Sequence, residues 1–173
     1  DELANTIRDL TEAKATSKGL IFSISHPDLL VRGDKLLLQQ IISNLVSNAI
    51  QYTERGEVIV KFFNSNDFLH ISVSDTGCGI AVEDQSRIFQ EFFRVDKTRA
   101  QHDGLGLGLS IVKRICKLID SEISINSQVD KGTTFTLSTR YPVSSAVDPI
   151  EVKNHHIPSP YAKGISIFGR TIA

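Results

Sequence analysis

The stretch HISVSDTGCGI, residues 70–80, decides how the chain folds. In it Ile71 and Val73 alternate with polar residues, which predicts a β-strand that buries one face. The next position on that face is Asp75, a carboxylate, and two glycines follow closely. Burying a carboxylate costs free energy unless a hydrogen-bond donor meets it. An Asx-turn is the common local source of such a donor, and a ligand carrying an amino group is a source from outside.

The composition is that of one domain with a buried core, because 40% of the 173 residues are hydrophobic. The net charge of −1 gives no reason to expect a nucleic acid or a membrane surface as partner. The two cysteines form no metal-type pair and favour a reduced, cytoplasmic location. No apolar run reaches the roughly 18 residues of a membrane span. The chain contains no methionine, so we expect a fragment of a longer protein.

Hydrophobic periodicity predicts a two-layer α/β sandwich, in which helices cover one face of a mixed, mostly antiparallel sheet. Helices are expected over residues 2–18, 35–52 and 109–120, with a short helix and an aromatic cluster within 81–93. Strands are expected over residues 20–25, 29–32, 58–62, 68–75, 123–127 and 133–141. These elements make residues 1–141 the expected domain. Prolines and serines interrupt residues 142–173, which we expect to be a linker or the start of a following domain, such as a receiver.

The helix expected over residues 35–52 carries an unusual polar stripe. Gln40, Asn44 and Asn48 recur at every fourth position, and Gln51 lies on the same side. Exposed helix surfaces usually favour Lys and Glu, which are better helix formers than Asn. Carboxamide oxygens suit a Mg²⁺ ion that also contacts phosphate oxygens. On its own, the stripe also fits a solvent-facing helix surface.

A second glycine-rich stretch, GLGLGL at residues 104–109, opens the next long helix. Backbone N–H groups at such a helix start can hold phosphate. The stretch is not a P-loop, because no Gly-Lys-Ser/Thr follows, and no strong strand precedes it as in a dinucleotide-binding fingerprint. Alone, it is weak evidence for a phosphate site.

Together, and in this order, the three features resemble the ATP-binding catalytic domain of bacterial sensor histidine kinases. The wider superfamily has the Bergerat fold and includes DNA gyrase B, MutL and the heat-shock chaperone ATPases. The resemblance covers about residues 2–141. The matching motifs are the N box at residues 44–49, the first glycine box at 75–80, the phenylalanine box at 88–96, the second glycine box at 104–112 and the closing strand motif at 131–135.

This resemblance implies roles for individual residues. Asp75 would accept a hydrogen bond from the adenine amine, with Thr133 or Thr134 at the purine edge. Asn48 would be the Mg²⁺ ligand, with Asn44 beside it as a second catalytic residue. Residues 94–107 would form a lid over the triphosphate. The full set expected to bind ATP is Asn44, Asn48, Gln51, Tyr52, Asp75, Gly77, Gly79, Ile80, Phe93, Arg94, Lys97, Gly104, Leu105, Gly106, Leu107, Gly108, Leu109, Thr133 and Thr134.

At two positions this chain has residue types that differ from those common in the superfamily that it resembles. Asn44 stands where the ATPase branch has a Glu that activates water, and a carboxamide cannot act as a general base. This favours phosphoryl transfer to another acceptor over hydrolysis. Gln51 stands where the family often has a basic residue, so one contact to phosphate is expected to be lost.

The acceptor histidine of such a kinase lies on a helical hairpin, and none of the five histidines has that setting. We therefore expect the partners to be a phosphoacceptor hairpin of the same parent protein, dimeric in the parent, and a response regulator or receiver domain. Neither nucleic acid nor direct membrane contact is expected. Two alternatives stay open: a regulatory module that binds ATP without transfer, and a serine kinase of the anti-sigma type.

Overall fold

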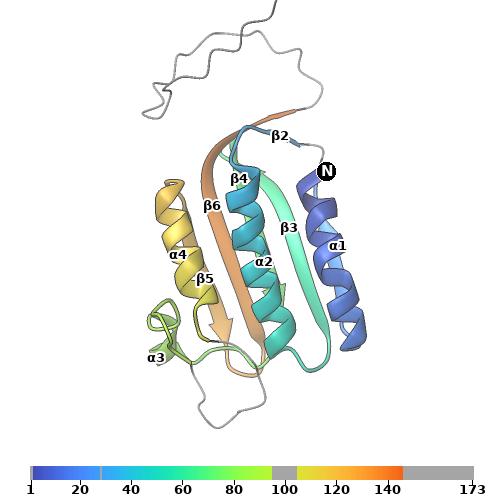
Figure 1. Ribbon diagram of the computed structural model, residues 1–173, viewed down its shortest axis with the longest axis vertical. Helices are drawn as coiled ribbons and strands as arrows, with labels where there is room; N and C mark the ends of the chain where they lie inside the picture. Colours follow the sequence, from blue (N-terminus) through green and yellow to red (C-terminus); the bar gives the residue numbers. More distant parts are fainter. Residues whose placement is uncertain (1, 28, 95–104, 146–173) are drawn as a thin grey trace, which may run out of the picture.

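The computed structural model describes residues 2–27, 29–94 and 105–145. Its helices are α1 (Glu2–Ser17), α2 (Lys35–Tyr52), α3 (Val82–Gln85) and α4 (Gly108–Leu118). Its strands are β1 (Ile21–Ser25), β2 (Leu29–Val31), β3 (Glu57–Ser65), β4 (Phe68–Asp75), β5 (Glu122–Gln128) and β6 (Gly132–Ser145). Figure 1 shows α1, α2 and α4 side by side over one face of the sheet. The predicted two-layer α/β sandwich is confirmed.

The sheet has the order β1-β3-β4-β6-β2, and β5 pairs with β6. The pair β1–β3 is parallel and the other pairs are antiparallel, as the mostly antiparallel prediction required. In this register Asp75 at the end of β4 lies opposite Thr133 on β6. One end of the sheet therefore contains three strand termini: the end of β4, the end of β5 and the start of β6.

The core lies between this sheet and the helices. On α2 the side chains of Ile41, Ile42 and Val46 are completely buried, and they face the inward positions of β3 and β4. Asp34 caps α2, because its Oδ1 accepts a hydrogen bond from the Leu37 backbone N–H at 3.0 Å. The helix that carries the polar stripe is thus fixed at its start by a cap and along its length by burial.

Strand β1 pairs with β3, and β2 pairs with the end of β6. Two details differ from the sequence-based expectations. The helix within residues 81–93 is confined to Val82–Gln85, and turns follow it. Strand β6 runs on to Ser145, beyond the expected boundary at residue 141. Among the described residues, no helix has the length and apolar character to cross a membrane.

Candidate functional site

Asp75 ends β4 as a half-buried carboxylate on the helix-covered face of the sheet. Its Oδ1 accepts hydrogen bonds from the backbone N–H groups of Gly77 at 2.9 Å and Thr133 at 3.2 Å. Burial raises the pKa of Asp75 above its ordinary value, and the two N–H donors lower it in part. The Asx-turn considered from sequence is therefore present, but both bonds use one oxygen. The other carboxylate oxygen, Oδ2, takes part in neither of these two bonds.

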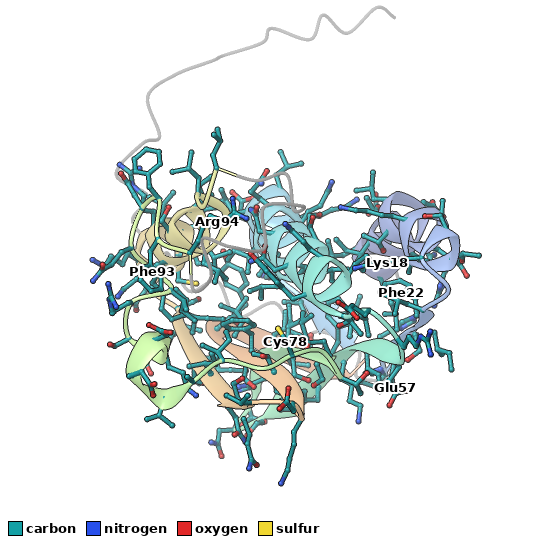
Figure 2. The ribbon with its side chains drawn as sticks, turned by 90° about the horizontal axis from the view of Figure 1, so that it is seen from below. Lys18, Phe22, Glu57, Cys78, Phe93 and Arg94 are labelled. Atoms are coloured by element: carbon teal, nitrogen blue, oxygen red, sulfur yellow. The ribbon has the colours of Figure 1, made fainter. Side chains whose placement is uncertain are left out.

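The glycines after Asp75 let the loop pass between α2 and β5. A Cβ atom on Gly77 would lie 2.4 Å from the Tyr52 backbone oxygen, and one on Gly79 would lie 2.0 Å from the Gln128 backbone oxygen. Gly79 also has a φ of +67°, which glycine adopts most readily. Between them, the Cys78 N–H donates to the Tyr52 oxygen at 3.3 Å. In Figure 2 Cys78 lies near the middle of this end of the molecule.

The two candidate threonines lie on opposite faces of β6. Thr133 is 6% exposed and shares the helix-covered face with Asp75. Thr134 points the other way, where its hydroxyl donates to the Ser74 hydroxyl at 3.0 Å. Of the two predicted threonines, the structure therefore brings Thr133 to Asp75 and places Thr134 on the other face of the sheet.

The carboxamides Asn44 and Asn48 meet the start of α4. A Cβ atom on Gly108 would lie 3.3 Å from Asn44 Oδ1 and 3.8 Å from Asn48 Oδ1. The Asn44 amide nitrogen donates to the Gln40 backbone oxygen at 2.9 Å, which turns Oδ1 toward that helix start. The polar stripe of α2 thus faces a neighbouring element, and the alternative of a solvent-facing surface does not describe these two residues.

The start of α4 is built by Gly106, Leu107, Gly108 and Leu109. The N-cap position is Leu107, which makes no side-chain capping bond, so it leaves the first N–H groups of the helix to other partners. Such N–H groups attract anions, and the helix dipole adds to this attraction. Leu105 is 77% exposed just before this turn. The Asn44 and Asn48 amide oxygens therefore lie beside the first turn of α4, and these groups are of the kinds that bind a cation and phosphate oxygens.

The aromatic cluster after α3 has mixed roles. Phe89 packs edge-on against Phe135 with ring centroids 6.3 Å apart, so it is a partly buried residue that packs against the core. The Arg87 guanidinium lies 4.4 Å from the Phe93 ring centroid. Figure 2 shows Phe93 and Arg94 on the α4 side of the site. The predicted contacts Lys97 and Gly104, with most of the expected lid, lie outside the described residues.

Two further predicted residues lie at the last turn of α2. Gln51 is half-buried, and the side chain of Tyr52 is 42% exposed. The Lys18 ammonium, from beyond the end of α1, donates to the Ile50 and Gln51 backbone oxygens at 2.7 Å and 2.8 Å. This end of α2 is therefore held from the α1 side, where Figure 2 labels Lys18.

The sequence analysis missed Ser127 on β5. Its hydroxyl accepts a hydrogen bond from the Ile80 N–H at 2.8 Å, so it anchors the end of the first glycine box. The signal was present: Ile123 and Ile125 lead to Ser127 on one face of β5, as Ile71 and Val73 lead to Asp75. Asp75 and Ser127 thus share one sequence pattern, a polar residue at the end of an alternating apolar strand face.

Comparison with known families gives one match that covers most of the domain. The profile of the histidine kinase-, DNA gyrase B- and HSP90-like ATPase family matches residues 33–143. The sensor histidine kinase RcsC of Salmonella typhimurium is 37% identical over 136 residues, which are 74% of this chain and 14% of RcsC. The aerobic respiration control sensor protein ArcB homolog of Haemophilus influenzae is 38% identical over 120 residues, 68% of this chain and 37% of that protein. The chain thus spans a minor part of these relatives.

Solved structures show the same fold. The chain resembles full-length ShkA in complex with AMPPNP with a TM-score of 0.75 and 27% identity, over 84% of this chain and 30% of ShkA. It resembles the catalytic domain of histidine kinase ThkA with a TM-score of 0.69 and 29% identity, over 80% of this chain and 90% of that domain. The second match covers nearly the whole of a separate catalytic domain.

Proposed function

Because this chain belongs to the histidine kinase-, DNA gyrase B- and HSP90-like ATPase family, we propose that it is the ATP-binding catalytic domain of a sensor histidine kinase. It would bind Mg-ATP and transfer the γ-phosphoryl group to a histidine on a separate domain. The observation that carries this proposal is the approach of the Asn44 and Asn48 amide oxygens to Gly108 at the start of α4. The half-buried Asp75 carboxylate, where the base would bind, lies at the same end of the sheet.

The adenine would bind at Asp75. Its free carboxylate oxygen would accept from the exocyclic amine, while Oδ1 stays fixed by Gly77 and Thr133. Gly77 and Gly79 let this loop pack against the backbone at Tyr52 and Gln128, and the purine would bind beside the loop held in this way.

The residues present fit a Mg²⁺ ion, since neutral amide oxygens are ligands that this cation accepts beside phosphates and water. Asn48 would be the ligand, with Asn44 next to it. When bound, the ion neutralises charge that builds up on the phosphates. The N–H groups at the start of α4 would hold phosphate oxygens, and Arg94 and Lys97 would contribute from the lid.

Transfer would need no general base from Asn44. The acceptor imidazole nitrogen attacks the γ-phosphorus, the bond to the bridging oxygen breaks, and ADP leaves. A carboxamide at position 44 cannot activate water, so phosphate would pass to the histidine and not to solvent. The partners would be a phosphoacceptor hairpin of the parent protein and a response regulator or receiver domain.

Phosphotransfer in trans tests this function. The chain is incubated with γ-labelled Mg-ATP and the phosphoacceptor hairpin of its parent, with Asn48→Ala as the matched inactive variant. Label that appears on the hairpin and is lost in acid supports the proposal. Nucleotide binding without label would favour the regulatory module, and acid-stable label would favour the serine kinase.

A further inference from the structure

Ser127 makes three polar contacts with one hydroxyl group. Its Oγ lies 2.8 Å from the Ile80 backbone nitrogen, 3.1 Å from the Gly132 backbone oxygen and 2.9 Å from the Thr133 hydroxyl. A serine hydroxyl offers one hydrogen and two lone pairs. The hydrogen and both lone pairs are therefore used, so each of the three contacts must be one of these hydrogen bonds.

The directions of these bonds follow from the partners. The Ile80 N–H can only donate, and the Gly132 carbonyl can only accept. The single hydrogen of Ser127 must therefore go to Gly132, because otherwise two oxygens would face each other without a hydrogen. The remaining contact has a hydrogen only if Thr133 donates it to Ser127.

This leaves the Thr133 hydroxyl with lone pairs only. We propose that Ser127 is a positioning residue that fixes Thr133 as a hydrogen-bond acceptor, and thereby makes the pocket select a purine with an amino group over one with a carbonyl group. The inference rests on the proposed function, since it assumes that a purine enters the pocket of Asp75. Thr133 and the ionised Asp75 would then present acceptors together, and a purine carbonyl would meet only oxygen lone pairs.

The frame around Ser127 is held by a second residue. The Gln85 side-chain amide, on α3, donates to the backbone oxygens of Ile80 and Ser127, both at 3.0 Å. It ties together the two segments that the Ser127 hydroxyl also joins. The Ser127 hydroxyl cannot swing away from Thr133 without breaking contacts to the glycine loop.

The test compares ADP with IDP, which differ at one exocyclic purine position, amino against carbonyl, and at the neighbouring N1, which carries a hydrogen only in IDP. Titration calorimetry gives the ratio of their affinities for the wild-type chain and for Ser127→Ala, Ser127→Thr and Ser124→Ala. The wild type should prefer ADP, and Ser127→Ala should lower that preference roughly three- to tenfold, the value of a neutral hydrogen bond. The released Thr133 hydroxyl can then donate to IDP.

Two variants separate this effect from a general loss of structure. Ser127→Thr keeps the hydroxyl and should keep the wild-type ratio. Ser124 is exposed on the same strand and only donates weakly to the Thr136 backbone oxygen, at 3.4 Å, so Ser124→Ala should also keep it. An unchanged ratio in Ser127→Ala would overturn the inference while ATP binding itself stands. A wild-type chain that binds neither nucleotide would overturn the proposed function as well.

A spectroscopic measurement on the wild type does not depend on how the variants fold. The Thr133 hydroxyl proton should exchange slowly with water and show a nuclear Overhauser effect to the β-protons of Ser127. A rapidly exchanging Thr133 hydroxyl would overturn the inference.

Discussion

For Asp75, folding favours the neutral carboxyl group, whereas the proposed contact with nucleotide requires the ionised carboxylate. Its surroundings raise the pKa of the carboxyl group through burial, so the folded chain favours the neutral form more than the unfolded chain does. The proposed contact with the adenine amine needs the ionised form. The ionised group therefore costs stability in the nucleotide-free domain and is retained for the contact with ligand.

The variant Asp75→Asn separates these two demands. We expect nucleotide affinity to fall roughly 10- to 100-fold, because a charge-assisted hydrogen bond is lost. The amide oxygen would keep the bonds to Gly77 and Thr133, so the amide NH₂ would face the adenine amine, donor against donor. The nucleotide-free variant should unfold at the same temperature as the wild type or higher, as measured by calorimetry. A variant that loses stability and keeps affinity would contradict this account.

The dependence on pH has a definite sign. A carboxyl group whose pKa is raised on folding contributes stability at low pH, and this contribution is lost as the pH rises through the folded-state pKa. The stability difference between the wild type and Asp75→Asn should therefore shrink on acidification. Nucleotide affinity should fall in the same direction, beginning at a higher pH than for an ordinary aspartate.

Single residues were predictable where strand or helix periodicity sets their direction. Spacing predicts the directions of Asp75 and of the pair Asn44 and Asn48, while the roles proposed for them come from the family resemblance. Thr133 can be told from Thr134 by the same alternation, because Phe135 and Leu137 place Thr133 on the buried face of β6. The face on which Ser127 lies follows from Ile123 and Ile125, whereas the partners of its hydroxyl depend on segments distant in sequence and required the structure.

At the scale of elements, α2 carries the site and must be fixed at both ends. Asp34 caps its start. Its end presents backbone oxygens to Lys18, and a cation stabilises the negative end of a helix dipole. The next carbonyl, that of Tyr52, receives the Cys78 N–H, so the position of this helix end sets the position of the glycine loop.

Replacing Lys18 by Met should loosen this end while keeping the length of the side chain. We expect the free energy of unfolding to fall by about 1 kcal/mol, since two carbonyl groups lose a charged donor at an exposed site. Chemical denaturation measures the change, and the amide resonance of Cys78 should shift. Lys14→Met is the control, because Lys14 reaches only the Ser47 hydroxyl, at 3.3 Å. Equal losses in both variants would contradict a specific role for Lys18.

Elements with long, regular patterns were predicted well. The helix over residues 35–52 and the strand over 68–75 agree with α2 and β4. The aromatic stretch within 81–93 was less predictable, because its apolar spacing resembles a helix while tertiary contacts decide its course. Phe92 has a φ of +62° and donates its N–H to the Gly106 oxygen, so the chain turns there to meet the start of α4.

At the scale of the whole molecule, the fold serves to bring four distant segments to one end of a sheet. The order β1-β3-β4-β6-β2 places the ends of β4 and β5 beside the start of β6, and α2 and α4 lie over them (Figure 1). Periodicity predicted the layers but not the long-range strand partners, because such pairing depends on contacts between segments far apart in the chain. The pairing of β1 with β3 and of β2 with β6 emerged only from the structure.

The central claim is that the Asn-bearing helix and the glycine-rich helix start together hold Mg-ATP. The most direct measurement is calorimetric titration of the chain with AMPPNP, with and without Mg²⁺, for the wild type and Asn48→Ala. We predict saturable binding that Mg²⁺ strengthens in the wild type, and an Asn48→Ala variant that still binds but no longer responds to Mg²⁺. A wild-type chain that does not bind AMPPNP, or an Asn48→Ala variant with an unchanged response to Mg²⁺, would contradict the account.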